Sequence, residues 1–310
     1  MQKKLDKNPL NITVKVFLFL ILFAYTLSMI FALGWGFLTS LKSSYDFINL
    51  NNVLGLPDSM WSREELRFGN YVTAWNSLPV TANVAFYCGE RLIEHYSETN
   101  FIGLFLNTIL YSVVGSALAS VVPCIVAYLC AKFKYKVSGI IYTVIVVTMT
   151  IPIIGTQPAV IELLRSLGVY DTFFGYFIQR VGFGGMYFLM YYAFFVGFSD
   201  TYIEAAEIDG AGQYSILFRI ILPLTIKMIG TVFLIMFVSY WNDYQTSLIY
   251  MPTHPTLAYA VYWNTVETGG LTDTPSKTAA CMLLALPILL IYIIFKDKIT
   301  GNMTLGGIKG

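Results

Sequence analysis

The sequence TYIEAAEIDGAGQYSILFRIILPL occupies residues 201–224 and separates two long apolar runs. Thr201, followed three residues later by Glu204, fits a capping box, in which a hydroxyl and a carboxylate satisfy free amides at a helix start. A short helix over Tyr202–Asp209 would then end at Gly210, because glycine tolerates the left-handed conformation that is common after a helix C-terminus. The first half of the segment is therefore predicted to be a short capped helix.

The second half is predicted to form another helix over Gln213–Leu222 that stops before Pro223, since the residue before a proline disfavours helical backbone. Two helices joined by a glycine turn outside a bilayer would make a rigid element on which another protein could dock. Ala205 and Ala206 would permit close approach of such a partner, although alanine is also simply a good helix former. A plain connector between two spans is the alternative, and these residues alone do not decide between the two.

The chain around this segment has the composition of a membrane protein. Of its 310 residues 56% are hydrophobic and 12% charged, against about a quarter charged in soluble domains. Crossing a bilayer takes roughly 20 apolar residues, and continuous apolar runs favour helices over barrel strands. Six runs qualify: Val16–Thr39, Phe101–Ala131, Val137–Ala159, Phe183–Ser199, Leu224–Tyr250 and Ala279–Phe295. We predict an all-α integral membrane protein, a single transmembrane domain over residues 1–310 with six transmembrane helices.

Basic residues predict the orientation of the spans, because they accumulate on the cytoplasmic side. With six crossings the following residues share one side: Lys3, Lys4, Lys7, Lys132, Lys134, Lys136, Arg219, Lys296 and Lys298. Both termini and residues 200–223 are then cytoplasmic, and residues 40–100 form an external loop. The net charge of +1 gives no indication of a nucleic-acid partner, so the lipid bilayer is the expected environment.

Several kinds of chemistry lack a signature in the sequence. No phosphate-binding loop of the form G-x-x-x-x-G-K-[ST] occurs, so any nucleotide would bind to another chain. His95 and His254, the two histidines, do not stand in metal-ligand spacing. The spans contain few charges, with Asp243 near the outer end of the fifth and Lys227 near its inner end, which disfavours an ion-coupled carrier. A passive channel stays open on composition alone.

Residues 204–223 resemble the signature loop of binding-protein-dependent ABC importer permeases. Glu204-Ala205-Ala206, Gly210, Ile220 and Leu222-Pro223 fill every fixed position of that motif at its fixed spacing. Further stretches are similar to the second, six-span permease subunit of maltose-type carbohydrate importers: Asn70-Tyr71 with Trp75, Asn107-Thr108, Ile151–Gln179, Trp241-Asn242-Asp243 and the closing Gly306–Gly310. The likeness covers nearly the whole chain and is weakest from Ser77 to Thr99.

The resemblance implies a bacterial cell-membrane machine of two permeases, two ATPase subunits and an external solute-binding protein. ATP and Mg would be bound by the ATPase subunits, so this chain is expected to hold no cofactor or metal and not to be an enzyme. The residues implied in coupling to the ATPase are Glu204, Ala205, Ala206, Asp209, Gly210, Ile220, Leu222 and Pro223. The tail residues Gly306, Gly307, Lys309 and Gly310 would reach along the ATPase, or else form a frayed glycine-rich end.

Candidate residues for the substrate path cluster at the outer half of the fifth span: Tyr240, Trp241, Asn242, Asp243 and Tyr244, with Asn107 in the second. Aromatic rings pack on sugar C–H surfaces, and amides and carboxylates bind hydroxyls, which suits a carbohydrate. Aromatic residues also gather at bilayer interfaces as belts, and Asp243 could mainly hold a helix end.

Two other segments carry open alternatives. Pro152, Gly155 and Pro158 could kink a span that lines the path, or could end a helix that leads into an external turn. The loop over residues 40–100 is expected to touch the solute-binding protein or else the partner permease. The function expected from all these features is carbohydrate import; the same architecture importing another solute, such as glycerol phosphate, and a passive channel are the alternatives.

Overall fold

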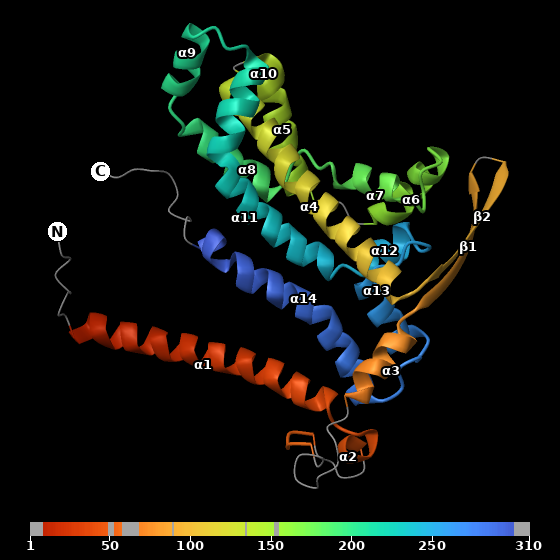
Figure 1. Cartoon of the computed structure of the whole chain (residues 1–310). Helices are drawn as coiled ribbons and strands as arrows, with labels where there is room; N and C mark the ends of the chain where they lie inside the picture. The colour runs from red at the N-terminus through yellow and green to blue at the C-terminus, as the bar shows by residue number, and fades with distance from the viewer. Residues whose placement is uncertain are drawn as a thin grey trace. The chain divides into compact units, whose positions relative to one another are not determined.

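The computed structural model describes residues 9–48, 53–57, 68–88, 90–133, 135–151 and 155–300 (Figure 1). These residues are mostly helical, which confirms the predicted class. They fall into two compact units. One unit comprises Met1–Ser77 with Thr268–Ala285, and the other comprises Leu78–Glu267 with Leu286–Gly310; each is described by itself.

Among the residues that the structure describes, four helices are long and apolar enough to cross a membrane, and they coincide with the first, second, fifth and sixth predicted spans. They are Thr13–Ser40 within α1 (Pro9–Ser40), α4 (Phe101–Lys132), Gln213–Trp241, and Thr274–Ile291 within α14 (Thr274–Thr300). Shorter apolar helices stand at the third and fourth predicted spans, namely α5 (Lys136–Thr150) and α8 (Met186–Val196). The chain is therefore a multi-pass membrane protein.

The third predicted span, Val137–Ala159, is wrong beyond Thr150. Ile151 has extended backbone, with φ −85° and ψ 115°, because Pro152 follows it in the sequence. A separate helix, α6 (Thr156–Ser166), begins after Gly155, whose φ is +79°. The structure thus has a helix that ends before a proline, which is the second of the two alternatives for this segment.

The fifth predicted span, Leu224–Tyr250, also ends early, at Trp241, where α11 (Leu222–Trp241) stops. After this stop, the Asp243 carboxylate accepts a hydrogen bond from the Thr246 amide at 3.0 Å and so begins a new short helix, α12 (Gln245–Tyr250). A side-chain acceptor at this position satisfies an amide that the helix itself cannot, which explains why the chain turns here.

The predicted all-α class did not include a β-hairpin, which the structure has within the segment predicted to be an external loop. Strands β1 (Val80–Cys88) and β2 (Arg91–Thr99) pair antiparallel, from Val80 opposite Thr99 to Cys88 opposite Arg91. Exposed and covered positions alternate along both strands, as the period of two in a strand requires. The covered positions of β1 are all apolar, whereas those of β2 are mostly polar, so the pattern is weaker in the second strand.

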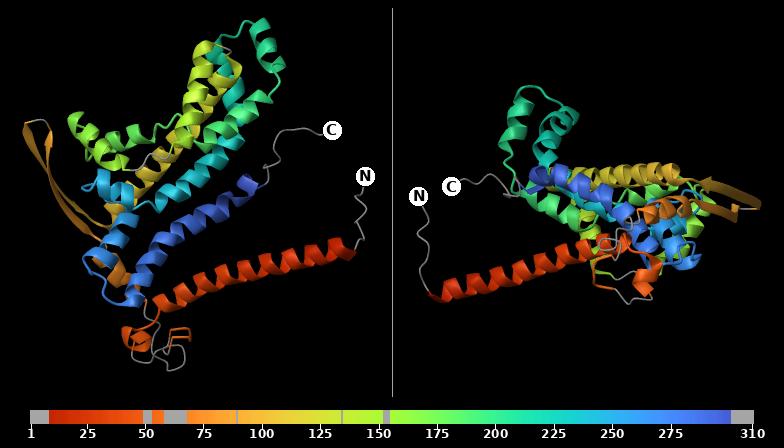
Figure 2. Two further views of the ribbon diagram at one scale, coloured as in Figure 1. Left: turned by 180° about the vertical axis from the view of Figure 1, so that it is seen from behind. Right: turned by 60° about the horizontal axis from the view of Figure 1, so that its bottom comes forward.

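The core of the second unit is built on α4, which packs against α8 and α11 (Figures 1 and 2). Small residues allow the close approach: a Cβ atom at Gly115 of α4 would lie 2.5 Å from the Tyr176 hydroxyl of α7 (Phe173–Arg180). The buried Ser112 and Ser116 hydroxyls donate to carbonyls one turn back in α4, which satisfies them without a partner helix. Small residues and self-bonded hydroxyls are typical of helix packing in membranes.

In the first unit, Asn70 and Tyr71 hold the chain that leaves α1. The Asn70 amide donates to the Ser40 and Lys42 carbonyls, each at 2.8 Å, and the Tyr71 hydroxyl lies 2.7 Å from the Ser40 hydroxyl. Both come from α3 (Gly69–Ser77). These two residues of the family likeness therefore have a structural task, because they satisfy carbonyls at the end of a helix.

Candidate functional site

The segment after α8 forms a short helix, α9 (Thr201–Ile208), followed by Gly210 with φ +79°. The predicted glycine turn is confirmed, but the capping box is wrong. The residue that caps α9 is Asp200, whose carbonyl accepts from the Ile203 and Glu204 amides, while the Thr201 hydroxyl pairs with Ser199. Thr201 lies inside the helix, one position too late to cap it.

The Asp200 side chain, unlike its carbonyl, makes no capping hydrogen bond to α9. Its carboxylate instead forms an ion pair with Lys132, the last residue of α4, at 2.5 Å. The Lys132 ammonium also donates to the Phe198 carbonyl at 2.6 Å and lies 5.7 Å from the centre of the Phe198 ring. The Lys132 side chain is 10% exposed and that of Asp200 60%, so the ion pair is open to solvent on the Asp200 side. Asp200 and Lys132 thus fasten the start of α9 to the end of α4.

Most of the predicted coupling residues are exposed on this segment. Glu204, Ala205, Asp209 and Gly210 face solvent, whereas Ala206 is buried in the core of the unit. Two large apolar side chains that the sequence reading did not single out are also open, since Ile208 is 86% and Tyr214 83% exposed. A charged protrusion that exposes isoleucine and tyrosine has the composition of a protein-binding surface.

The predicted second helix does not stop before Pro223. Instead α10 (Gln213–Ile216) continues through a π-helical turn (Leu217–Ile221) into α11. A proline clashes with the carbonyl four residues back in an α-helix, and the wider turn just before Pro223 relieves this conflict. Ile220 is half-buried and Pro223 exposed, and Leu222 donates its amide to the Leu217 carbonyl across the turn.

Just beyond the C-terminal end of α11, Asp243 is held by partners that the sequence analysis missed. Arg180 donates to its carboxylate at 2.9 Å, and the Tyr111 hydroxyl donates at 2.6 Å. The Arg180 guanidinium also lies 4.3 Å from the centre of the Tyr240 ring and 4.9 Å from that of Tyr176. A carboxylate close to the membrane needs a compensating cation. That requirement is the signal in the sequence that points to a basic partner such as Arg180.

The other predicted path residues lie in different surroundings. Trp241 is buried, with its ring edge-on to Phe105. Asn242 donates its amide to the Val238 carbonyl, and the Tyr244 ring stacks on Tyr262 at 4.3 Å. The geometry gives Tyr240, Trp241 and Asp243 packing and ion-pair contacts, while Asn242 and Tyr244 have exposed surface. Their role in the path stays a prediction.

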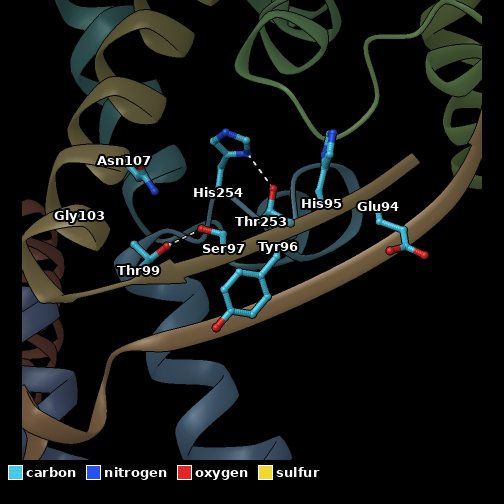
Figure 3. Close-up of a pocket in the computed structure, with 9 residues that line it drawn as sticks. All are labelled: Glu94, His95, Tyr96, Ser97, Thr99, Gly103, Asn107, Thr253 and His254. Atoms are coloured by element: carbon cyan, nitrogen blue, oxygen red, sulfur yellow. Dashed lines mark hydrogen bonds between the residues drawn. The ribbon is translucent and has the colours of Figure 1, made fainter. Parts of the chain in front are cut away.

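Asn107 lies in a different place, at a polar pocket of about 550 Å³ between the N-terminal end of α4, β2 and the turn at Thr253-His254 (Figure 3). The Asn107 amide donates to the Pro255 carbonyl at 3.1 Å, which leaves its oxygen as an acceptor. The lining residues are Glu94, His95, Tyr96, Ser97, Thr99, Gly103, Asn107, Thr253 and His254. The Glu94 and Tyr96 side chains belong to the face of β2 opposite His95 (Figure 3). The hydroxyl, amide and imidazole groups of the other lining residues are donors and acceptors of the kind that bind polyols.

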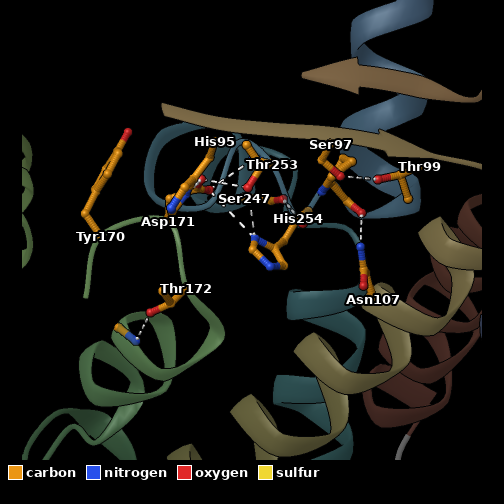
Figure 4. Close-up of polar contacts among 12 residues, drawn as sticks. His95, Ser97, Thr99, Asn107, Tyr170, Asp171, Thr172, Ser247, Thr253 and His254 are labelled. Atoms are coloured by element: carbon orange, nitrogen blue, oxygen red, sulfur yellow. Dashed lines mark hydrogen bonds and ion pairs between the residues drawn. The ribbon is translucent and has the colours of Figure 1, made fainter. Parts of the chain in front are cut away.

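Beside this pocket, Asp171 ties the hairpin to the turn at Thr253-His254 (Figure 4). Its buried carboxylate lies 2.6 Å from His95 Nδ1, accepts from the Thr253 amide at 3.0 Å and from the Thr253 hydroxyl at 2.6 Å. His254 Nδ1 is 3.8 Å away. The ionised Asp171 carboxylate can only accept, so His95 Nδ1 carries the proton in this contact.

These contacts set the protonation of Asp171. Burial alone would raise the pKa of Asp171, but the nearby His254 imidazole and the hydrogen bonds from Thr253 and His95 outweigh burial and hold that pKa below its ordinary value. Asp171 is therefore ionised at neutral pH. The two histidines meet on one carboxylate, although no group of three His, Cys, Asp or Glu residues in the described part of the chain is arranged to hold a metal ion.

Residues 119–304 match the model of the family described as "Binding-protein-dependent transport system inner membrane component". The chain belongs to this family. It is therefore a membrane subunit of a transport system rather than an enzyme, and the predicted family likeness is confirmed. Residues 201–223, which the family motif occupies, lie within the matched range.

Individual relatives of this permease are similar along most of their length. The chain is 26% identical to "Diacetylchitobiose uptake system permease protein NgcG" of Streptomyces coelicolor over 299 residues, which cover 92% of this chain and 86% of the relative. It is 22% identical to "Lactose transport system permease protein LacG" of Rhizobium radiobacter, over 71% and 80% of the two chains. A crystal structure of a bacterial ABC transporter for import of the acidic polysaccharide alginate shares the fold, with TM-score 0.70, 19% identity and coverage of 95% and 99%.

The permease tail residues Gly306, Gly307, Lys309 and Gly310 lie outside the described residues, so their predicted contact with an ATPase stays a prediction. The same holds for the individual coupling residues and for the count of six spans.

Proposed function

We propose that this permease is one of two membrane subunits of an ABC importer that carries a carbohydrate inward. The observation that carries the proposal is the coupling segment, residues 200–223. It combines the spacing of the family motif with an exposed helix that is fastened to α4. The relatives whose printed names refer to diacetylchitobiose and to lactose support a saccharide as the cargo.

The proposed assembly contains a second permease, two ATPase subunits and an external solute-binding protein in a bacterial cell membrane. ATP and Mg are bound by the ATPase subunits. Both termini of the permease are cytoplasmic in this arrangement, on the side of Lys132 and the coupling segment, and β1–β2 is external. The contacts of Asp171 support six crossings. Asp171 binds His95, which lies just before the N-terminal end of α4, whereas Lys132 is the last residue of α4. The chain between Lys132 and Asp171 would therefore cross the membrane once.

In the proposed mechanism α9 enters a cleft of the ATPase, and Glu204 makes a charged contact there. Ile208 and Tyr214 supply the apolar part of the contact, since they are the most exposed large apolar side chains of the segment. Closure of the ATPase dimer moves α9, and the Lys132–Asp200 ion pair passes that movement to α4. The permease helices then rock between two orientations and alternate the access of the cargo.

The test replaces the coupling side chains in the assembled importer. Glu204→Lys combined with Ile208→Glu is expected to leave the permease in the membrane but to lower co-purification of the ATPase and stimulated ATP hydrolysis by roughly tenfold or more, since buried interface anchors carry most of the binding energy. Glu162→Lys, an exposed carboxylate on α6, is the matched control. Wild-type stimulation and wild-type co-purification in the double variant would refute the coupling role.

A further inference from the structure

The hairpin β1–β2 has two faces of different chemistry. Figure 3 shows His95 and Tyr96 on opposite sides of β2, and the strand register extends this division to both strands. One face, the inner face, turns toward α6 and the turn at Thr253-His254. The other, the outer face, comprises Thr81, Asn83, Ala85, Tyr87, Leu92, Glu94, Tyr96 and Glu98, all of them exposed.

The inner face is fastened at two places. At the tip, Phe86 meets the Tyr170 ring edge-on at 4.8 Å, the Arg165 guanidinium lies 4.9 Å from the Tyr170 ring centre, and the Cys88 thiol donates to the Arg165 carbonyl at 3.1 Å. In the middle of the strands, where His95 pairs with Val84, His95 binds the buried Asp171. Contacts at the tip and in the middle hold the hairpin in one orientation, which lowers the entropy that a partner would have to remove on binding.

The outer face exposes large side chains that have no neighbour to cover them. Tyr96 is 70%, Tyr87 65% and Leu92 51% exposed. Glu94 and Glu98 stand among them, and none of the eight positions is a lysine or an arginine. Tyrosine gives a large, rigid contact area at low entropic cost. The face therefore combines aromatic anchors with two carboxylates, and no basic residue stands among its eight positions.

Two occupants fit this face poorly. Lipid tails are excluded by the two carboxylates and by Asn83, because charged groups facing hydrocarbon are costly. A permanent interface with the second permease would be more apolar, since obligate interfaces resemble a domain core cut in half. The composition of the outer face is instead that of a contact that forms and separates.

We propose that the outer face of β1–β2 is a docking surface for the external solute-binding protein, which meets it with a patch of lysine or arginine. This inference rests on the proposed importer function. The binding protein must arrive loaded and leave empty in each cycle, and a rigid surface of opposite charge speeds such encounters without making them permanent. The carboxylates guide the approach, and the two tyrosines make the close contact.

The test uses the complete importer in lipid nanodiscs with the solute-binding protein encoded beside it, loaded with its cargo. In the double variant Glu94→Lys/Glu98→Lys, the concentration of binding protein that gives half-maximal ATP hydrolysis is expected to rise about tenfold or more at low salt, while basal hydrolysis is unchanged. Wild-type and variant should converge as salt is added, because salt screens exposed charges. Glu162→Lys, on α6 beside the inner face, is the matched control.

A photoreactive phenylalanine analogue in place of Tyr96 then identifies the occupant, with cross-linked peptides read by mass spectrometry. A cross-link to the binding protein supports the proposal. An unchanged half-maximal concentration in the charge variant, or a cross-link to the second permease instead, overturns it. If the binding protein fails to stimulate even the wild-type complex, the proposed importer function fails, which is a separate outcome.

Discussion

Asp171 combines two features that are rarely found together. Its backbone lies in the left-handed region, with φ 59°, and its side chain is completely buried. Aspartate and asparagine adopt this backbone more readily than other residues with side chains. The carboxylate is compensated by His95 and by both Thr253 donors, so the position requires a short acceptor that also tolerates the turn.

Asp171→Asn tests the charge separately from the backbone. Asparagine tolerates the same φ, but its amide replaces one acceptor oxygen with a donor that faces other donors. We expect the free energy of unfolding to fall by about 2–3 kcal/mol, the usual cost of losing a charged hydrogen bond in a buried site. The measurement is the melting temperature of the detergent-purified complex.

The effect should also depend on pH. The pKa of Asp171 is lowered in the folded protein, so its stabilising contribution is present above the ordinary aspartate pKa of about 4 and is lost as pH falls through the lower, folded value. Wild type should therefore exceed Asp171→Asn in melting temperature at pH 7, with the gap closing in strongly acidic buffer. A gap that widened on acidification would contradict this assignment.

Asp243 and Arg180 form a second compensated pair, with side chains 18% and 20% exposed. Removing one charge leaves the other shielded and unpaired, which costs about 3 kcal/mol in buried pairs and somewhat less here. We expect Asp243→Asn and Arg180→Met each to lower the melting temperature clearly, and the double variant to lose less than the sum of the two.

The same variants separate this structural role from sugar binding by Asp243. If the carboxylate mainly holds α7 against α12, the concentration of cargo at half-maximal uptake should change little in variants that still assemble. A large rise in that concentration with unchanged melting temperature would favour the substrate-path interpretation instead.

At the scale of elements, the contact between α4 and α9 is the connection that matters for coupling. Asp200 precedes α9 directly, and its carboxylate is turned to Lys132 rather than to the first amides of its own helix. An aspartate cap is worth about 1 kcal/mol to a helix. Asp200 forms an ion pair with α4 in place of this cap. We infer that the pair maintains the position of α9 more than its stability.

Lys132→Met and Asp200→Asn should each reduce uptake per ATP hydrolysed, by several-fold, because α9 would move without α4. The exchange of charges, Lys132→Asp with Asp200→Lys, should restore part of the ratio if the pairing is what counts. Lys136→Met removes an exposed lysine just beyond α4 and serves as the control. Equal uptake per ATP in wild type and in both single variants would contradict the connection.

The elements that could be predicted from the sequence are those with a local cause. Long apolar runs predicted α1, α4, α11 and α14, and Gly210 predicted the turn after α9 because only its own backbone is involved. Elements that depend on distant partners were missed. The sequence around Thr201 fits a capping box, but the carboxylate of the actual cap residue, Asp200, binds Lys132, which lies 68 residues away.

The same reasoning applies to the candidate site. Arg180, Asp171 and the hairpin become functional residues only through contacts made between segments 63 to 82 residues apart. By contrast, the continuation of the helix through Pro223 has a local cause, but a π-helical turn has no sequence signature as clear as that of a helix stop.

At the scale of the molecule, two of the proposed crossings are short. With a rise of 1.5 Å per residue, the 11 residues of α8 span roughly 16 Å and the 15 of α5 roughly 22 Å, against a hydrocarbon core of about 30 Å. Non-helical chain is tolerated at membrane depth only where protein or a water-filled cavity satisfies its backbone. We therefore expect the segments beside α5 and α8 to be covered by other helices of the assembly.

The number of crossings determines on which side of the membrane α6 lies. With four crossings, everything between Lys132 and Gln213 would stay cytoplasmic; with six, the residues around Asp171 are external. In a variant with its four cysteines replaced, we expect a membrane-impermeant maleimide applied to intact cells to label Leu167→Cys and Tyr87→Cys but not Ile208→Cys, all three being exposed positions. Permeabilised cells should show labelling at all three. If Leu167→Cys stays protected until the cells are permeabilised, four crossings remain. That result would also contradict the proposed external position of the hairpin, because Asp171, four residues after Leu167, binds His95 of β2.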